Sequence, residues 1–158
     1  MIIKSEHIHS YILTSVLIWC LLIVIAPFLA HLKLVFSSGF IYLFFSKICH
    51  QYPERSFFIW DKQFAVCARC SGLYFGFLIA TIFFPFLKGL KNFTPPPRYL
   101  FFIALTPITI DLSLTIFHIW QNTFFTRFAS GLLLGNVVAL FVLSGIHKIR
   151  EENYELKS

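Results

Sequence analysis

The sequence predicts an all-α, polytopic membrane protein with four transmembrane helices and a short re-entrant or interfacial helix. Apolar residues make up 58% of the 158-residue chain and charged residues only 13%, whereas soluble domains carry about 25% charged residues. Mean hydropathy is +0.77, and 21 phenylalanines are more than a soluble fold of this length buries. Four apolar runs are each long enough to cross a hydrocarbon core of roughly 30 Å. We therefore expect one membrane domain over residues 1–158.

The first apolar run predicts a span over about 11–34, in which Pro27 favours a kink. A secretory signal peptide has a shorter apolar core, of about 7–15 residues, followed by a small-residue cleavage site. Because this run is longer and lacks such a site, we expect the helix to be retained. The next apolar run, residues 36–48, is too short to span. It predicts the re-entrant or interfacial helix, which delivers Cys49 to the membrane surface.

Three further spans are predicted at about 66–87, 99–120 and 128–146, the first of them preceded by a motif loop at 49–65. Lys91–Arg98 contains three consecutive prolines and predicts a rigid, non-helical connector. Pro107 favours a kink in the third span. Between the last two spans, Gln121–Thr126 predicts a tight polar turn. Residues 147–158 form a charged tail that we expect to fray into water.

The charge pattern bears on orientation, because cytoplasmic loops of membrane proteins are enriched in Lys and Arg. Four spans place both termini on one side. The terminal side holds Lys4, Lys88, Lys91, Arg98, Lys148, Arg150 and Lys157, and the opposite side holds Lys33, Lys47, Arg55, Lys62, Arg69 and Arg127. If the three arginines on the opposite side belong to a site, seven Lys and Arg remain on the terminal side against three on the other. That excess favours cytoplasmic termini, with the motif loop facing outward. We expect a bacterial inner-membrane location.

The net charge of +6 is attributed to topology and to attraction for lipid head groups. No basic helix or arm suited to gripping a duplex is visible, so we expect no nucleic-acid partner. The lipid bilayer and an anionic small molecule or lipid head group are the partners that the sequence indicates.

Small residues recur every four positions on two of the predicted spans. The second span carries Ala68, Gly72, Gly76 and Ala80, and the fourth carries Gly131, Gly135 and Ala139. Such stripes let helix backbones approach closely in lipid, although small residues also recur in membrane helices without that role. A close approach of these two helices would bring Arg69 and Arg127 to one mouth of the bundle.

Asp111 is the anomaly of the third span, since it lies roughly 15 Å from the Trp120 end. An unpaired carboxylate at that depth is costly, so Asp111 requires a partner. Thr115 and His118 follow on the same helical face. The candidate partners are Arg69, Arg127, His50 or a metal ion, and the pair has either a purely structural role or a place in a binding or catalytic site.

The cysteines offer a second constellation. Cys67 and Cys70 form a C-x-x-C at the start of the second span, and Cys49 and His50 lie upstream across the loop. Three thiols and an imidazole match the Cys₃His set of a structural zinc site, or three ligands and an open position if His50 does not bind. Adjacent Cys49 and His50 need a bent backbone to reach one ion, and an outward-facing site favours oxidation. A disulfide or redox pair and unlinked thiols therefore remain alternatives.

Three arginines form the remaining constellation. Guanidinium groups bind phosphate or carboxylate in a bidentate manner, and Arg55 and Arg69 are interleaved with the cysteines. Arg127 stands near the start of the fourth span. The alternative is that arginines at span ends extend to head groups without forming a site.

Two blocks of residues extend these motifs. The first block is Cys49-His50-Gln51, Arg55-Ser56-Phe57-Phe58 and Cys67-Ala68-Arg69-Cys70-Ser71-Gly72, with Tyr74 and Gly76. The second block is Pro107–Asp111 with Asn122, Arg127, Ser130, Gly131 and Gly135. Together they resemble a bacterial and archaeal membrane family labelled domain of unknown function 2085, with Ser71 and Ser130 where Thr is expected and Leu112 where Gly is usual. The resemblance implies a small multi-span membrane protein with a shared polar site, and it implies no particular activity.

Three functions are consistent with these patterns. The first is a hydrolase or transferase acting on an anionic lipid-linked substrate, in which Cys49, Cys67 and Cys70, with or without His50, bind zinc. Arg55, Arg69 and Arg127 would then bind the anion, and Asp111 or His50 would serve as general acid or base. The second is a thiol-disulfide oxidoreductase that uses Cys67 and Cys70 with a membrane quinone, Cys49 being the resolving thiol. The third is a non-catalytic, zinc-stapled membrane subunit.

Overall fold

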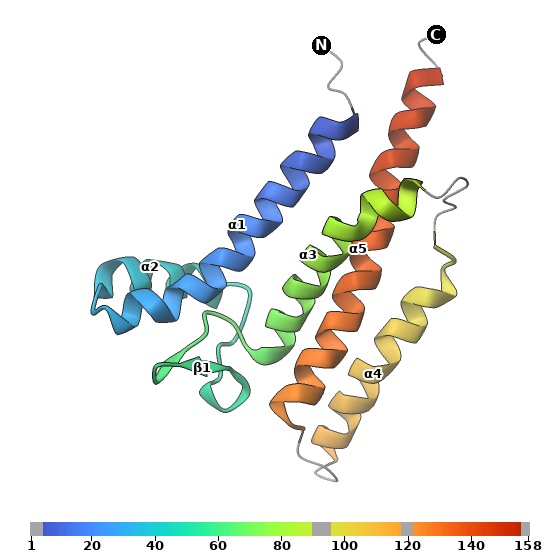
Figure 1. Cartoon of the computed structure of the whole chain (residues 1–158). Coiled ribbons are helices and arrows are strands. Elements are labelled where there is room, and N and C mark those ends of the chain that lie inside the picture. The colour runs from blue at the N-terminus through green and yellow to red at the C-terminus, as the bar shows by residue number, and fades with distance from the viewer. Residues whose placement is uncertain (1–4, 90–95, 118–121, 156–158) are drawn as a thin grey trace.

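The computed structural model describes residues 5–89, 96–117 and 122–155. Within these ranges the chain forms five α-helices and one two-stranded hairpin (Figure 1). The helices are α1 (Ser5–His31), α2 (Val35–Ser46), α3 (Ala68–Gly89), α4 (Tyr99–Ile116) and α5 (Phe124–Glu155). A 3₁₀ turn (Pro53–Arg55) and the strands β1 (Phe58–Ile59) and β2 (Lys62–Gln63) lie between α2 and α3. The predicted all-α fold is confirmed.

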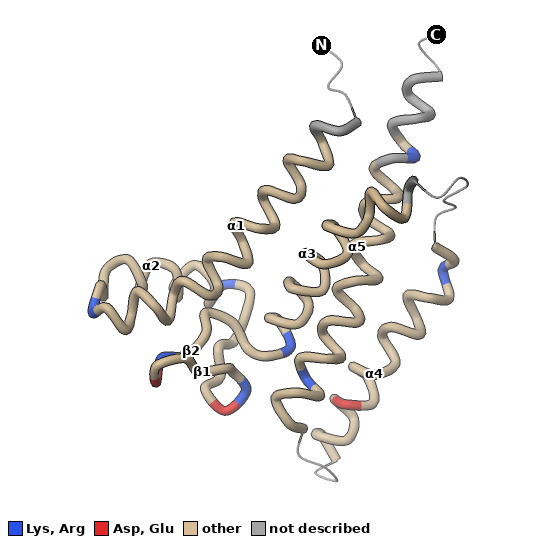
Figure 2. The backbone as a smooth tube through the Cα atoms, in the orientation of Figure 1, with Lys and Arg blue, Asp and Glu red and all other residues tan. Residues whose placement is uncertain are grey.

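Four of these helices are long and apolar enough to cross a membrane. The candidate spans are Ile8–His31, Ala68–Leu87, Tyr99–Ile116 and Phe124–Ile146. The prolines do not end the helices, since α1 continues through Pro27 and α4 through Pro107. Figure 2 shows most charged residues near helix ends and in the loops, as expected for helices whose middle parts lie in lipid, and an acidic residue inside α4.

The spanning helices form a single layer rather than a closed bundle. α1 packs on α3, α3 on α5, and α5 on α4, in the order that Figure 1 shows. The start of α1 and the end of α5 lie at one end of this layer, while α2 and the hairpin lie at the other. The motif loop is therefore separated from these two helix ends by the length of the spanning helices.

The α3–α5 contact is the closest in the layer, and glycine makes it possible. A Cβ added to Gly72 would overlap the Phe128 carbonyl, and one added to Gly135 would overlap the Leu73 carbonyl. A Cβ on Gly131 would overlap the carbonyl of Arg69. The predicted close approach of these helices through their small residues is thus confirmed, and it places the start of α5 directly beside Arg69.

The short helix α2 is too short to span, as predicted, and most of its surface is exposed. Phe36 is 92% exposed and Phe40 69%. The other side of α2 packs through Phe45 into a buried cluster with Ile23 of α1 and Val66 of the loop before α3. This cluster also contains Cys49, so the apolar packing of α2 fixes the first cysteine of the motif.

Two expectations about the bounds of α5 are wrong. Residues 124–126 belong to α5 rather than to a turn, because the Thr123 hydroxyl accepts a hydrogen bond from the Thr126 backbone N–H (3.2 Å) and caps the helix. The charged tail does not fray at His147, since α5 continues to Glu155. Extending an existing helix requires no new nucleation, and this segment contains many good helix formers.

Candidate functional site at the loop end of the helices

The three cysteines of the motif come from two elements. Cys49 follows α2, where its backbone N–H donates to the Phe45 carbonyl (2.9 Å), and its side chain is buried. Cys67 directly precedes α3, and Cys70 lies in the first turn. The Ser71 N–H donates to the Cys67 carbonyl (2.9 Å), which closes that turn. Helix geometry therefore brings Cys67 and Cys70 together, and the packing of α2 adds Cys49.

The sulfur atoms of Cys49, Cys67 and Cys70 all lie within 4.8 Å of one another. The Cys67 backbone N–H donates to the Cys49 sulfur at 3.2 Å. Hydrogen bonds from the thiols of Cys49 and then Cys70 lower the pKa of Cys67 below its ordinary value. The cluster consequently favours a thiolate at Cys67, the form in which cysteine binds metals.

The donor set of this cluster fits a thiophilic metal ion. In a tetrahedral zinc site the Zn–S bonds are about 2.3 Å, so that neighbouring sulfurs lie roughly 3.8 Å apart. Three sulfurs already within 4.8 Å need only small side-chain rotations to reach that spacing. Soft thiolate ligands select zinc, copper(I) or iron–sulfur chemistry over magnesium or calcium.

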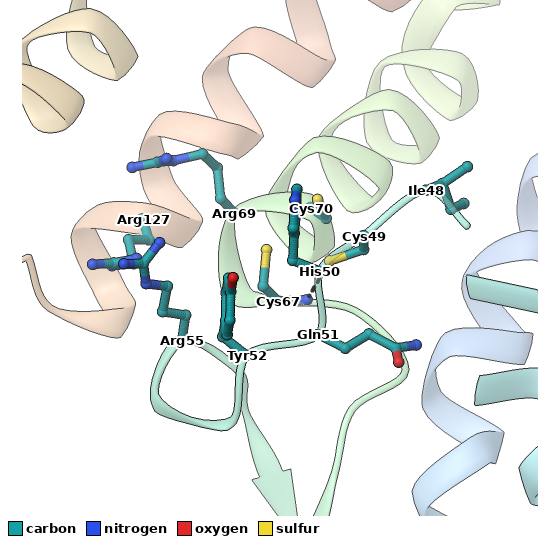
Figure 3. A pocket seen from close by; sticks show the side chains of 10 residues that line it. All are labelled: Ile48, Cys49, His50, Gln51, Tyr52, Arg55, Cys67, Arg69, Cys70 and Arg127. Carbon is teal, nitrogen blue, oxygen red and sulfur yellow. Dashed lines mark hydrogen bonds between the residues drawn. The ribbon is translucent and has the colours of Figure 1, made fainter. Parts of the chain in front are cut away.

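His50 lies outside this group of three, although it follows Cys49 directly. Its imidazole stacks on the Tyr52 ring, with centroids 5.7 Å apart and planes 9° apart. His50 is exposed and lines the same cavity as the cysteines (Figure 3). The arrangement thus gives three clustered sulfur ligands and an imidazole that faces the space beside them.

A cavity of about 350 Å³ connects the cysteines with the arginines. Figure 3 shows the guanidinium groups on one side of this cavity and the sulfurs on the other, with Tyr52 between them and His50 beside the sulfurs in this view. The lining residues are Ile48, Cys49, His50, Gln51, Tyr52, Arg55, Cys67, Arg69, Cys70 and Arg127. The loop and the starts of α3 and α5 therefore build one shared site.

Each arginine is held differently. The Arg55 guanidinium carbon lies 5.3 Å from the centroid of the Tyr52 ring, within the range of a cation–π contact. The Arg127 Nε–H donates to the Asn122 carbonyl (3.4 Å). Arg69 donates to the Asp111 carboxylate and forms an ion pair with it. Only Arg69 has its charge compensated by a carboxylate in the part of the chain that the structure describes.

Asp111 belongs to a polar network with Thr115 and Asn122, next to the cavity but outside its lining. Its residue exposure is 8%, and its backbone carbonyl accepts hydrogen bonds from the Asn122 side-chain amide (2.7 Å) and the Thr115 hydroxyl (2.8 Å). The same amide also donates to the Thr115 hydroxyl (2.6 Å). Asp111 does not line the cavity itself, and His118, expected on the same face, lies outside the described residues. Asp111 is therefore connected to the cavity by its ion pair with Arg69, which lines the cavity.

The sequence model of a family described as "Predicted membrane protein (DUF2085)" matches residues 49–141. This match covers more than half of the 158 residues. The chain belongs to the DUF2085 family. Every candidate site residue, from Cys49 to Arg127, falls inside the DUF2085 match.

Two relatives of this DUF2085 chain are archaeal proteins that are described as uncharacterized. One, from Methanocaldococcus jannaschii, is 38% identical over 140 residues, which cover 85% of this chain and 90% of the relative. The other, from Methanothermobacter thermautotrophicus, is 32% identical over 104 residues, 66% of this chain and 90% of the relative. No solved structure matches the chain. Since both relatives are archaeal, they give no support to the expected bacterial membrane.

Gln51 braces the candidate site in a way that sequence reasoning missed. Its side-chain amide donates to the carbonyls of Tyr42 (2.9 Å) and Ala65 (2.7 Å), while its own carbonyl accepts from the Gln63 amide (2.5 Å). Gln63 also donates to Ser56 (3.0 Å). These bonds join α2 to both sides of the motif loop. The only sequence signal for Gln51 was its place in the Cys-His-Gln triplet. No periodicity or spacing indicates that its side chain connects α2 to the loop.

Proposed function

We propose that the protein is a metal-dependent membrane hydrolase or transferase that acts on an anionic, lipid-linked substrate. The observation that carries the proposal is the convergence of three sulfurs, from Cys49, Cys67 and Cys70, beside a cavity lined by three arginines. Zinc is the proposed metal, because it is the commonest tetrahedral ion bound by thiolates with no redox chemistry. A zinc ion held there would act as a Lewis acid toward a phosphoryl or acyl oxygen.

The residues on the other side of the cavity would bind and orient the substrate. Arg55 and Arg127 present guanidinium groups, and Arg69 is positioned by Asp111. His50 faces the same space, and an imidazole can both donate and accept a proton, so His50 is the proposed general acid or base. Asp111 is accordingly a positioning residue in this proposal, not the acid or base, because its carboxylate pairs with Arg69 outside the cavity lining.

A thiol-disulfide oxidoreductase is the second candidate, and the same sulfur cluster favours it. Cys67 and Cys70 would be the working pair, Cys49 the resolving thiol, and a membrane quinone the electron acceptor. A third candidate is a zinc-stapled subunit without catalysis, in which the arginines only pair internally. The Arg69–Asp111 ion pair is consistent with that alternative, whereas Arg55 and Arg127 have no carboxylate partner among the described side chains.

Metal analysis of the purified full-length protein tests the proposal. We expect about one zinc ion per chain in the wild type and its loss in Cys49→Ser, Cys67→Ser and Cys70→Ser. Cys20→Ser is the matched control, because Cys20 is a buried thiol that donates to the Tyr74 carbonyl (3.6 Å) and is not part of the cluster. Metal-free wild type would contradict both zinc proposals. Reversible oxidation of Cys67 and Cys70, followed by thiol trapping in intact cells, would favour the oxidoreductase.

We also propose that both termini are cytoplasmic and that the cavity opens on the opposite face. The four candidate spans, and the start of α1 and the end of α5 at the same end of the layer, support a common side for both termini. Reporter fusions to the C-terminus test the side. Fluorescence of a cytoplasm-only reporter is expected, and activity of a reporter that requires export would contradict the orientation.

A further inference from the structure

Two guanidinium groups of the cavity form no ion pair with a carboxylate among the described side chains, although Asp111 attracts Arg127 at longer range. Arg55 lies over the Tyr52 ring and Arg127 donates to the neutral Asn122 carbonyl. Neither has an acidic partner among the side chains that the structure describes. Arginine stays protonated under all physiological conditions, so an anion with about two negative charges would balance this pair.

A third donor points to the same kind of ligand. The Arg69 side chain keeps 23% of its surface exposed, and one nitrogen of its guanidinium, Nη2, pairs with Asp111. Arg69 lines the cavity with Arg55 and Arg127. The forks of Arg55 and Arg127 and the exposed part of the Arg69 guanidinium match a group with three terminal oxygens better than one with two.

These two properties separate the common biological anions. A phosphomonoester carries about −1.5 to −2 charge at pH 7 and has three terminal oxygens. A phosphodiester or a carboxylate carries a single charge and only two such oxygens. The start of α3 and the start of α5 both lie at this cavity, and helix N-termini add a further preference for phosphate.

The surroundings of the cavity indicate the head-group level of a membrane. Trp60 at the hairpin tip is 54% exposed and stacks on His31, at the end of the first span, with centroids 5.4 Å apart. Tryptophan favours the membrane–water interface. The exposed apolar side of α2 lies at the same end of the molecule (Figure 1). A lipid phosphate in the bilayer surface would therefore lie at the height of the arginines.

We propose that the cavity binds the terminal phosphate of a membrane lipid, a phosphomonoester, in preference to phosphodiester head groups. The inference deepens the proposed function and rests on its anion-binding half. Arg55 and Arg127 would each contact the phosphate through a guanidinium fork, and the exposed part of the Arg69 guanidinium would contact the third oxygen.

Binding by the full-length protein in neutral phosphatidylcholine nanodiscs tests this inference. One sample contains phosphatidic acid, a monoester, and a second contains phosphatidylglycerol, a diester. Thermal unfolding and native mass spectrometry report ligand stabilisation and retained lipid. We expect phosphatidic acid to raise the Tm more and to be retained, and we expect Arg127→Gln or Arg55→Gln to weaken this binding by roughly tenfold. Equal effects of both lipids would overturn the monoester preference.

Two controls make the outcome specific. Lys47→Gln removes a cation that directly follows α2, a helix at the same end of the molecule, and Lys47 does not line the cavity, so this variant should keep the preference for phosphatidic acid. Loss of the preference in this variant would assign it to general surface charge and overturn the proposal. Inorganic phosphate is added in a third arm, and stabilisation by it without any response to phosphatidic acid would overturn a lipid source.

The zinc content of the same preparations separates this inference from the proposed function. Zinc present without a phosphatidic acid preference overturns the phosphomonoester inference alone. If the wild type purifies without zinc and still prefers phosphatidic acid, the metal-dependent function is overturned and the binding of a lipid phosphate is supported.

Discussion

Arg69 at the start of α3 donates to the carboxylate of Asp111 in α4, although 42 residues separate the two in sequence. Their side chains retain only 23% and 10% exposure. α4 otherwise packs mainly on α5, so this ion pair joins it directly to the helix that carries Cys70. The pair both holds the layer together and orients an arginine of the cavity.

Asp111→Asn should destabilise the protein by on the order of 3 kcal/mol. Removing one partner leaves a largely buried guanidinium without its counter-charge, which costs about 3–5 kcal/mol in fully buried pairs. The remaining exposure of Arg69, 23%, places the cost near the lower end. Thermal unfolding of the detergent-solubilised protein measures the loss.

Asp61→Asn is the matched control for this prediction. Asp61 is exposed at the hairpin tip with φ of 55°, a conformation that Asn also tolerates. Its Tm should not change. The double variant Arg69→Met/Asp111→Leu should recover part of the lost stability, since apolar side chains can replace a buried pair. An Asp111→Asn protein as stable as wild type would show that the pair is not a stabilising contact.

Gly135→Ala should separate α3 from α5 and lower stability by about 1–3 kcal/mol, the usual cost of overpacking. The added Cβ would overlap the Leu73 backbone, which a side-chain rotation cannot relieve. Cavity binding should weaken together with stability, because the same contact sets the spacing of Arg69 and Arg127. Unfolding and nanodisc binding of the variant test both parts.

Gly145→Ala makes the same chemical change on the same helix where the space is open, with nothing within 4 Å of the added Cβ. It should leave stability unchanged or raise it by up to about 1 kcal/mol, because alanine favours the helix. Equal losses from both substitutions would mean that the α3–α5 contact is not as close as described.

The sequence was sufficient for the helices and for much of the site. Hydropathy identified the spanning segments, since lipid requires long apolar helices. The four-residue recurrence of small residues predicted the α3–α5 contact, and the cost of a buried carboxylate required a partner for Asp111. Arg69 was one of four candidates for that partner. The structure identifies Arg69 as the partner of Asp111. The sequence alone could not, because the answer depends on which face α4 turns toward its neighbours.

The loop was much less predictable than the helices. Its conformation depends on side-chain amides that bond to distant carbonyls, such as Gln51 to Ala65, and no periodicity encodes such contacts. The position of His50 against Tyr52 rather than among the sulfurs has the same origin, since Gln51 has φ of 52° and turns the chain. The extension of α5 beyond His147 was missed because charge composition alone does not distinguish a helix from a coil.

Gln51→Glu should lower both zinc content and stability while leaving the four spans intact. The substitution keeps the shape of the side chain but replaces a donor with an acceptor, facing the carbonyls of Tyr42 and Ala65. A buried acceptor without a donor costs about 1–3 kcal/mol or more when charged. Zinc analysis and thermal unfolding measure the effect. Glu54→Gln, an exposed change in the same loop, should alter neither, and full zinc occupancy in Gln51→Glu would contradict the bracing role.

Alkylation of Cys67 in zinc-stripped protein should be nearly independent of pH between about pH 6 and 8. An ordinary thiol, with a pKa of about 8.5, reacts roughly tenfold faster per pH unit in that window because its thiolate fraction rises. Hydrogen bonds from Cys49 and Cys70 lower the pKa of Cys67, so the thiolate is already formed at the acid end. Site-resolved mass spectrometry after timed iodoacetamide treatment measures the rate.

Cys49→Ser replaces the first hydrogen-bonding thiol with a shorter, differently placed hydroxyl, so the pKa of Cys67 should rise and its alkylation should regain a pH dependence. A wild-type rate that climbs tenfold per unit would show that the cluster does not stabilise thiolate, and the same result would weaken the case for a metal ligand at Cys67.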